Sequence, residues 1–405
     1  MTFKILAKLG PGLLFAGAAI GVSHLVQSTR AGADYGWGLL WALILVNLFK
    51  YPFFQFGPRY ALATGESLLE GYNKLGKSYI WIYFFLNLAT MFTIQTAVTI
   101  VTAGLASNLF GISTDMVYWS IAITVICFII LLLGRYKLLD KVIKGIILLL
   151  TISTILALLI AISNNDSSIS FTQVFPYGSD LLFVIAFMGW MPAPMDISVW
   201  HSIWVLEKKQ TLNNKLSVED GLFDFNIGYF TTVVLGICFL GLGALVMHDS
   251  GLTFSNRGGE FAGQLIDLYT LNLGDATYLV IAIAAFTTMF STTITTLDAS
   301  PRAMSKTSQL ILNKKNKDFY LLWISILAVG TSLVFLLLLT EMGLLVQIAT
   351  VLSFLTAPFY ALLNYKLIYS NHMPEKHRPG FKTKILSISG IIFLSGFSII
   401  YLLSL

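Results

Sequence analysis

Long apolar segments, each about as long as a membrane-spanning helix, constrain this chain more than any other feature of its sequence. A helix needs roughly 20 apolar residues to cross a bilayer, and such segments recur from residue 10 to residue 404 with short polar connections. Hydrophobic residues fill 56% of the 405 positions and charged residues only 11%, whereas soluble domains carry about 25% charged residues. Backbone groups in lipid must be satisfied internally, which favours helices, and the alternating pattern of a barrel is missing. The sequence therefore predicts an all-α polytopic membrane protein.

The apolar segments divide the chain into eleven predicted spans and leave no room for a separate soluble domain. We expect one transmembrane domain over residues 1–405, with inverted repeats at about 10–162 and 181–366 and an extra helix at 383–404. Cys127 and Cys238 both lie inside spans, so there is no disulfide framework and no zinc-type spacing. The predicted spans are 10–33, 38–63, 77–107, 114–133, 139–162, 181–205, 223–247, 275–300, 319–340, 342–366 and 383–404.

Basic residues gather in every second connection between the predicted spans. Cytoplasmic loops are enriched in Lys and Arg, so these connections are expected inside, with Arg30 and Arg257 as the basic residues of the outside segments. The prediction is a multi-pass protein of the inner (plasma) membrane with a cytoplasmic N-terminus and the C-terminus outside. The pattern also explains the net charge of +5 without a nucleic-acid partner. The residues assigned to the inside are Lys74, Lys77, Arg135, Lys137, Lys141, Lys208, Lys209, Lys215, Arg302, Lys306, Lys314, Lys315, Lys317, Lys376, Arg378, Lys382 and Lys384.

The first and sixth predicted spans contain helix-breaking residues near their middles. Gly21 lowers the cost of unwinding in the first span, and Gly189, Pro192 and Pro194 do the same in the sixth. Simple kinks are the alternative, because Gly and Pro are common in membrane helices. The breaks occupy matching positions in the two halves, however, and such a pair is the best sequence sign of a binding site in an inverted-repeat transporter. Unwound backbone there offers carbonyls to a cation and N–H groups to an anion.

Motifs spread over most of the chain point to one family. They are Gly10-Pro11-Gly12-Leu13-Leu14, Gln27 to Arg30, Ala31-Gly32-Ala33, Gly36-Trp37, Leu39-Leu40-Trp41, Asn47-Leu48, Ala63-Thr64-Gly65-Glu66, His201-Ser202, Phe290 to Thr295, and Leu344 to Pro358. In these motifs the sequence resembles the Nramp family of proton-coupled divalent-metal transporters. The resemblance implies a LeuT-like fold of 5+5 inverted repeats with broken helices 1 and 6. It also implies symport of a divalent metal such as manganese or iron with protons.

The sequence departs from the Nramp pattern where the family binds metal. The first helix of the family carries Asp-Pro-Gly-Asn, and this chain has Gly21-Val22-Ser23-His24 there, so both metal-binding side chains of that helix are replaced. The family's Met-Pro-His of the sixth helix falls on Pro194-Met195-Asp196 when counted back from His201-Ser202, or on Met191-Pro192 when aligned on the proline. The site is rebuilt, and the family's substrate does not follow from the fold alone.

A substitute set of metal ligands is available near the two breaks. Asp196 offers a carboxylate, His24 a ring nitrogen and Met191 a soft thioether that favours transition metals. Each residue also has another reading: Asp196 as a proton carrier or helix cap, His24 as a proton relay or a histidine bonded to a neighbouring helix, and Met191 as core filling. The other candidates for substrate binding are Gly21, Ser23, Met195, Gln347 and Thr350.

Lys50 is the least expected residue, because it lies about twelve residues into the second span. A lysine so far from either helix end cannot easily reach water, so we expect it to pair with a carboxylate, Asp196 or Asp298. A fixed cation there either replaces a coupling ion or attracts an anionic substrate, and a purely structural pair is the alternative. The residues assigned to proton or charge coupling are Lys50, Asp196, His201 and Asp298.

Two transport hypotheses remain open at this stage. The first is symport of a divalent metal with protons through the rebuilt site. The second is transport of a small organic or anionic solute by the same architecture, favoured by Lys50 and by the loss of the family's Asp and Asn. A membrane receptor or enzyme is a third class, but the chain has no nucleotide-binding loop and no hydrolase motif. We therefore expect no enzyme activity and no cofactor, and as partners only the bilayer, the transported solute or metal ion, and protons.

Overall fold

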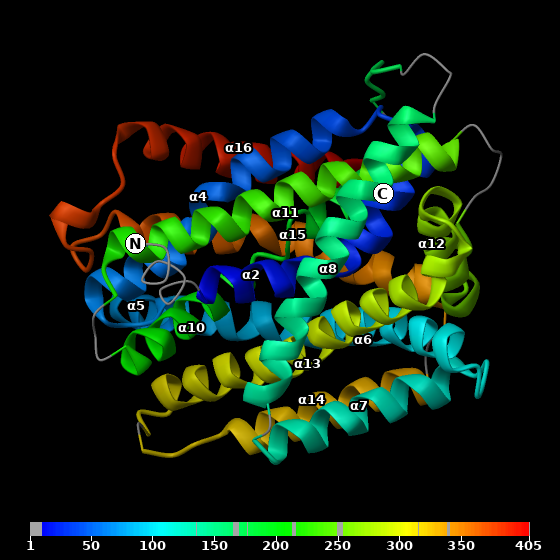
Figure 1. Cartoon of the computed structure of the whole chain (residues 1–405). Helices are drawn as coiled ribbons and strands as arrows, with labels where there is room; N and C mark the ends of the chain where they lie inside the picture. The colour runs from blue at the N-terminus through cyan, green and yellow to red at the C-terminus, as the bar shows by residue number, and fades with distance from the viewer. Residues whose placement is uncertain are drawn as a thin grey trace.

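The structure is a computed structural model in which the described residues form a bundle of helices (Figure 1). Side chains at 136–147 and 179 are not described. Among the basic residues that predict the orientation, Arg135, Lys215 and Lys315 lie outside the described residues, and the side chains of Lys137 and Lys141 do too. The described residues are 10–134, 136–164, 170–175, 177–212, 216–248, 254–314, 316–337 and 341–404.

The helices follow one another along the chain in two groups and a final helix. The first group is α2 (Pro11–Ala19), η1 (Ser23–Ser28), α3 (Thr29–Tyr35), α4 (Leu40–Thr64), α5 (Leu68–Leu75), α6 (Lys77–Phe110), α7 (Met116–Leu132) and α8 (Tyr136–Ser163). The second is α9 (Ser179–Trp190), α10 (Ile197–Thr211), α11 (Val218–Val246), α12 (Gly258–Leu273), η3 (Asp275–Thr277), α13 (Tyr278–Ile311), α14 (Tyr320–Leu337) and α15 (Met342–Ile368). The short turn η4 (Glu375–His377) and α16 (Phe381–Ser404) complete it.

Every predicted span coincides with one helix or with a broken pair of helices. Seven of the described helices are long and apolar enough to cross a membrane, and α2 with η1–α3 forms an eighth, bent span. Three shorter apolar helices, Met116–Leu132, Leu148–Ser163 and Asp180–Trp190, account for the remaining predicted spans. The polytopic all-helical prediction is confirmed, while the boundaries of the two repeats stay a prediction.

Two helices were not among the predicted spans. Helix α5 is an eight-residue amphipathic helix that begins with a capping box, in which Ser67 and Glu70 satisfy each other's backbone N–H groups. Helix α12 has sixteen residues and buries Phe261, Leu265 and Tyr269. Both are too short or too polar to cross a membrane, so a search for apolar runs passes over them. Figure 1 shows them at opposite ends of the bundle.

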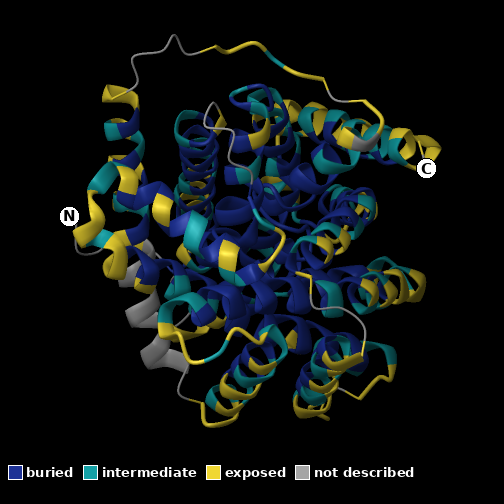
Figure 2. Ribbon diagram, turned by 90° about the vertical axis from the view of Figure 1, so that its right-hand side faces the viewer, coloured by how far each residue is buried: buried dark blue, intermediate teal, exposed yellow. Residues whose placement is uncertain are grey.

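The predicted breaks are present in both helices. In the first, α2 ends at Ala19 and the chain bends by 46° before it continues as a π-helical turn, η1, and then α3. Such π-helical turns are frequent at functional sites. In the sixth, the residues from Met191 to Asp196 are not helical, and they separate α9 from α10. Both segments are buried, and Figure 2 shows buried residues, in dark blue, concentrated in the interior of the bundle.

Glycines let the broken helices pack directly against their neighbours. A Cβ atom on Gly12 would lie 2.1 Å from the backbone oxygen of Asp224, so only glycine allows α2 to approach α11 this closely. A Cβ atom on Gly189 would lie 2.0 Å from the backbone oxygen of Thr350, which fixes α9 against α15. Because packed interiors tolerate little overlap, these contacts position both breaks at the centre of the bundle.

Candidate functional site

A small closed cavity lies where the two helix breaks meet. Its volume is about 20 Å³, about the space of one water molecule. Its lining residues are three with hydroxyl groups, two tryptophans and otherwise aliphatic ones, and no carboxylate lines it. The lining residues are Ala18, Ala19, Val22, Ser23, Ile94, Val98, Trp190, Pro194, Ile197, Trp200, Thr292 and Thr296.

Lys50 of α4 places its ammonium group at the C-terminal end of α9, where the sixth helix breaks. Its Nζ donates hydrogen bonds to the carbonyl oxygens of Met188 at 2.8 Å and Gly189 at 2.7 Å, and a longer one to Ala193 at 3.5 Å. The side chain is fully buried. Carbonyls at a helix C-terminus carry the negative end of the helix dipole, so the end of α9 stabilises a cation here. The lysine thus occupies carbonyl groups that would otherwise be free to bind an ion.

The prediction that Lys50 pairs with Asp196 or Asp298 is wrong. Asp298 instead accepts hydrogen bonds from Arg302 Nε and from the Tyr320 hydroxyl, both at 2.6 Å. Asp298 and Arg302 of α13 thus form a polar cluster with Tyr320 at the start of α14. The ammonium of Lys50 donates its hydrogen bonds to the carbonyls at the end of α9 instead of to either carboxylate.

Asp196 lies between the break and α10 but faces away from the cavity. Its Oδ2 accepts a hydrogen bond from the Thr90 hydroxyl of α6 at 2.7 Å, and its Oδ1 has no hydrogen-bond partner although the residue is buried. The Tyr360 hydroxyl of α15 lies beside this carboxylate without reaching hydrogen-bond geometry, and the buried Tyr83 hydroxyl is also unpartnered. The side chain makes no capping hydrogen bond to α10, so the reading of Asp196 as a helix cap is excluded in this conformation.

His24 is held on both ring nitrogens by the surrounding helices. Nδ1 lies 2.7 Å from the Ser23 hydroxyl and 3.1 Å from the carbonyl of Ala19, and Nε2 lies 2.9 Å from the carbonyl of Thr232 on α11. Neither nitrogen is left for a metal ion in this conformation. In the described part of the chain, no group of three His, Cys, Asp or Glu side chains is placed to hold a metal.

Of the predicted substrate-binding residues, only Ser23 lines the cavity. Gly21 allows α13 to approach, since a Cβ atom would lie 3.0 Å from the Thr292 hydroxyl. The Met191 sulfur packs against Gly236 of α11, as core filling does. Three further candidates lie outside the cavity lining: Met195 is buried, Gln347 is partly buried, and Thr350 accepts a hydrogen bond from Gln27 at 3.4 Å.

His201 lies among aromatic side chains rather than at the break. Its ring packs 5.7 Å from both Phe15 and Phe225, and neither ring nitrogen has a hydrogen-bond partner. The residue before it, Trp200, was passed over at the level of sequence, because a tryptophan in an apolar span is typical of core filling. Trp200 lines the cavity, and its indole N–H is buried without a partner.

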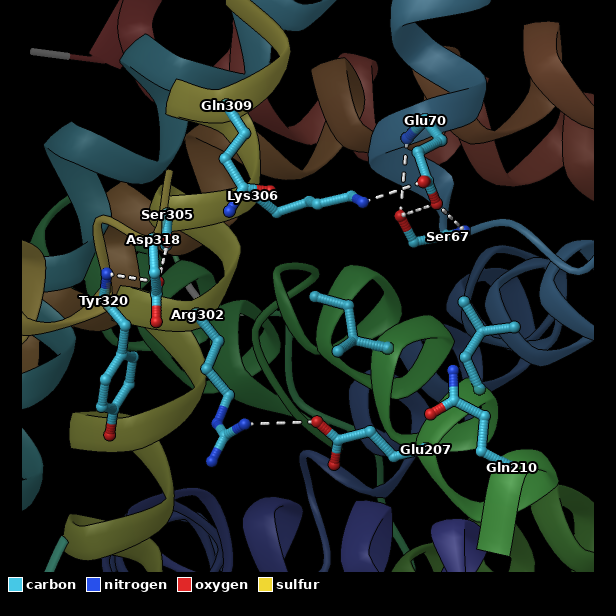
Figure 3. A pocket seen from close by; sticks show the side chains of 12 residues that line it. Ser67, Glu70, Glu207, Gln210, Arg302, Ser305, Lys306, Gln309, Asp318 and Tyr320 are labelled. Carbon is cyan, nitrogen blue, oxygen red and sulfur yellow. Dashed lines mark hydrogen bonds and ion pairs between the residues drawn. The ribbon is translucent and has the colours of Figure 1, made fainter. Parts of the chain in front are cut away.

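Ion pairs close the end of the bundle that is predicted to face the cytoplasm. Arg302 of α13 binds Glu207 of α10 at 3.2 Å, and Lys306 of α13 binds Glu70 of α5 at 2.9 Å. These side chains point into a pocket of about 370 Å³ between α5, α10 and α13 (Figure 3). One pair joins α13 to α10, the half-helix that follows the sixth break, and the other joins α13 to α5. The pocket shares no lining residue with the central cavity.

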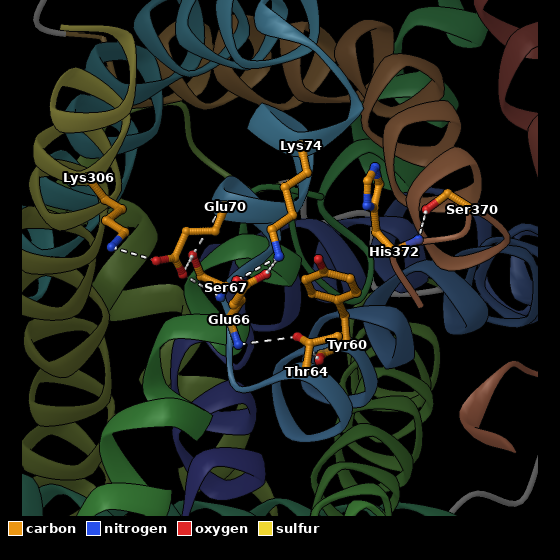
Figure 4. Close-up of polar contacts among 9 residues, drawn as sticks. All are labelled: Tyr60, Thr64, Glu66, Ser67, Glu70, Lys74, Lys306, Ser370 and His372. Atoms are coloured by element: carbon orange, nitrogen blue, oxygen red, sulfur yellow. Dashed lines mark hydrogen bonds and ion pairs between the residues drawn. The ribbon is translucent and has the colours of Figure 1, made fainter. Parts of the chain in front are cut away.

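Helix α5 connects several helices at the same end (Figure 4). The backbone N–H of Leu68 donates to the Ser202 hydroxyl of α10 at 3.1 Å, and the Tyr72 hydroxyl donates to Asn364 of α15. Burial alone would raise the pKa of Glu70, but the hydrogen bonds from Lys306 and Ser67 outweigh burial and hold that pKa below its ordinary value. Glu70 is therefore ionised when it binds Lys306.

Two further contacts hold the first helix at its ends. The Asp224 carboxylate of α11 accepts hydrogen bonds from the backbone N–H groups of Gly10 at 3.1 Å and Gly12 at 2.7 Å, where α2 begins. This arrangement satisfies donors that a helix start leaves free. At the other end, Arg30 donates to the Ser255 carbonyl at 2.7 Å and to Asn256 at 3.0 Å. These contacts tie the first broken helix to α11 and to the segment before α12.

Comparison with known proteins places this architecture in a family. The family model described as natural resistance-associated macrophage protein-like, or Nramp, matches residues 12–404. The chain belongs to the Nramp family. It is 38% identical to an uncharacterized protein of Pasteurella multocida over 98% of this chain and 92% of that protein. It is 24% identical to the metal transporter Nramp2 of Oryza sativa subsp. japonica over 96% of this chain and 76% of that protein.

Solved structures show the same fold. A manganese transporter of Eremococcus coleocola is 14% identical, with a TM-score of 0.75 over 98% of this chain and 86% of that chain. The transporter MhsT in complex with L-phenylalanine is 15% identical, with a TM-score of 0.62 over 98% of both chains. The LeuT-like fold expected from the resemblance is confirmed, and members of the Nramp family are transporters. Within this family, the chain carries Gly21 to His24 where the first-helix metal motif is expected.

Proposed function

We propose that this Nramp-family chain is a secondary transporter of a small solute other than a metal ion. The observation that carries the proposal is the ammonium group of Lys50 on the carbonyls of Met188 and Gly189. In transporters of this architecture, unwound carbonyls and the C-terminal ends of the half-helices coordinate the coupling cation. A lysine that fills these carbonyls removes ligands from a cation and places a positive charge beside its path.

The chemistry of the cavity supports the same proposal. Divalent ions bind through carboxylates, imidazoles, thiolates or several oxygen ligands. The cavity is lined by aliphatic side chains with Ser23, Thr292 and Thr296, and it contains no carboxylate. Asp196 and His24, the two candidate ligands, are turned to Thr90 and to the carbonyl of Thr232. Such walls suit the apolar body of a small organic molecule better than a metal ion.

Coupling to protons is a second part of the proposal. We assign the coupling proton to Asp196, because a buried carboxylate with one unpartnered oxygen is costly within a membrane and becomes less so when it is protonated. The Thr90 hydroxyl donates to this carboxylate, and the Tyr360 hydroxyl beside it makes no hydrogen bond in this conformation; a hydroxyl group can donate to a carboxylate or accept from a carboxylic acid.

A divalent metal remains the second candidate substrate, and the similarity of this chain to metal transporters favours it. The rice relative is named a metal transporter, and the Eremococcus coleocola structure is of a manganese transporter. Movement of α10 on opening would have to turn Asp196 toward the cavity for this candidate to hold.

Uptake of manganese by purified protein in proteoliposomes separates the two candidates. We expect no saturable Mn²⁺ uptake and no heat of binding in calorimetry, while the Eremococcus coleocola transporter reconstituted in parallel shows both. Saturable Mn²⁺ binding and uptake that are lost in Asp196→Ala would overturn the proposal and establish the metal transporter.

A further inference from the structure

We propose that the central cavity recognises the carboxylate of a small monocarboxylate, with the indole N–H of Trp200 as the donor that determines specificity. This inference rests on the proposed function and names its substrate class. It concerns a residue that neither the resemblance nor the sequence singled out.

The first observation is an unsatisfied donor in the wall of the cavity. Trp200 is 1% exposed, it lines the cavity, and its Nε1–H has no partner. A buried N–H without an acceptor costs about 1–3 kcal/mol, so the empty carrier keeps an unfavourable group at this position. The second tryptophan of the wall behaves differently, because Trp190 donates its N–H to the Ser353 hydroxyl at 2.7 Å. One of the two indoles is thus free for a ligand.

The donor property of this group fixes what it binds. An indole N–H donates and cannot accept, so its partner is an acceptor such as a carboxylate or carbonyl oxygen. Trp200 lies in the first turn of α10, a helix of fifteen residues. The first N–H groups of α10, from Ile197 to Trp200, all donate to backbone carbonyls, so only the positive end of the helix dipole favours an anion at this position. The free indole and the start of α10 therefore favour the same kind of ligand.

The charges around the break favour an anion over a neutral acceptor. The ammonium of Lys50 lies on Met188 and Gly189, next in sequence to Trp190 of the cavity wall, and its hydrogen-bond partners are neutral carbonyls. The nearby carboxylate of Asp196 is turned away toward Thr90. A buried cation without an ionic partner is costly in a membrane, and a carboxylate entering beside it reduces that cost.

The remaining walls define the body of the ligand. Ile94, Val98 and Ile197 present aliphatic carbon to the cavity, and its volume of about 20 Å³ holds one water molecule. A ligand must therefore push the surrounding helices apart when it enters. We expect only a small molecule to do so without breaking the ion pairs Arg302–Glu207 and Lys306–Glu70. We infer a monocarboxylate with a short, largely aliphatic body.

The experiment compares acids with their uncharged amides. Purified protein in nanodiscs is heated with propionate, lactate or N-acetylglycine, with the amide of each, and with Mn²⁺. We expect at least one acid to raise the melting temperature while its amide does not. The same acid should bind Trp200→Phe about tenfold more weakly, the loss expected for one hydrogen bond to a charged acceptor. Trp204→Phe, a neighbour outside the cavity lining, is the control for changes in packing.

Each outcome decides a separate point. Equal binding of acids and amides, or unchanged binding by folded Trp200→Phe, overturns the carboxylate site and leaves a non-metal transporter standing. Failure of every acid to bind also overturns it. Stabilisation by Mn²⁺ overturns the proposed function itself. If Trp200→Phe does not elute as a folded monodisperse protein, the comparison of acid with amide on the wild type still gives the answer.

Discussion

The Nζ atom of Lys50 lies 2.7 Å from the carbonyl oxygen of Gly189, so a side chain of α4 places a tethered amino group at the break between α9 and α10. Both residues lie at positions that only the folded bundle brings together, since they are 139 residues apart in the chain. The contact links the most unusual residue of the second span to the binding region of the sixth, and it leads to the first prediction.

Lys50→Ala should create a site for a free monovalent cation. The variant leaves the carbonyls of Met188 and Gly189 without donors, which costs about 1–3 kcal/mol for each buried acceptor. We expect its melting temperature to fall, and Na⁺ to restore part of the loss when it replaces choline in the buffer. Lys74→Ala removes the same charge from an exposed pair with Glu66 and should show no such difference. A Lys50→Ala protein that responds equally to Na⁺ and choline would contradict this prediction.

Asp196→Asn should not lower stability, although it changes a buried residue. The amide keeps an acceptor for the Thr90 hydroxyl and removes a carboxylate oxygen that has no partner. We expect a melting temperature equal to or above that of the wild type at pH 8. Thr90→Val should destabilise the wild type more than the Asp196→Asn variant, because hydrogen bonds to charged groups are the stronger ones. A double-mutant cycle with zero coupling would show that the contact carries no energy.

Asp224→Ala should release the start of α2. The carboxylate accepts hydrogen bonds from the backbone N–H groups of Gly10 and Gly12, which are among the free donors at the start of this helix. We expect a cysteine at Ala18, in a background without Cys127 and Cys238, to react faster with a water-soluble thiol reagent in the Asp224→Ala protein. Glu219→Ala changes an exposed carboxylate on the same helix and serves as the control. Equal reaction rates would show that Asp224 does not hold α2 closed.

Glu70→Gln should lower stability in a pH-dependent way. The hydrogen bonds from Lys306 and Ser67 outweigh burial and hold the pKa of Glu70 below its ordinary value of 4.5. The ionised group therefore stabilises the fold above that value, and the contribution is lost as the pH falls through the lower pKa of the folded state. We expect a loss of about 1 kcal/mol or less, typical of a partly exposed pair. The difference in melting temperature from the wild type should be constant between pH 8 and 6 and shrink below pH 4.5.

The spans and breaks were predictable because they depend on local chemistry. The lengths of the apolar segments predicted the helices, and Gly21, Pro192 and Pro194 predicted the two interruptions. The partners of Lys50 were not predictable, because backbone carbonyls carry no sequence signal and a carboxylate looks like the natural partner of a lysine. The direction of Asp196 depends on the rotation of α10, which is set mainly by its packing against α4 and α2.

Other parts of the site escaped sequence reasoning for a different reason. Trp200 resembles an ordinary core tryptophan until the structure shows that its N–H lacks an acceptor while that of Trp190 has one. The closing pairs join Arg302 and Lys306, which the sequence assigned only to the cytoplasmic side, to Glu207 and Glu70, which it did not single out. Charge patterns indicate a side of the membrane, but the partner of each charge depends on the tertiary fold.

The cation at the sixth-helix break is covalently attached to the chain, and this attachment has an energetic consequence for the living cell. An ion bound from solution is picked up on one side and released on the other, and its concentration gradient then drives transport. The ammonium of Lys50 is covalently part of α4 and is never exchanged. This position therefore draws no work from a sodium or potassium gradient, and its occupancy stays constant whatever the salinity of the surroundings.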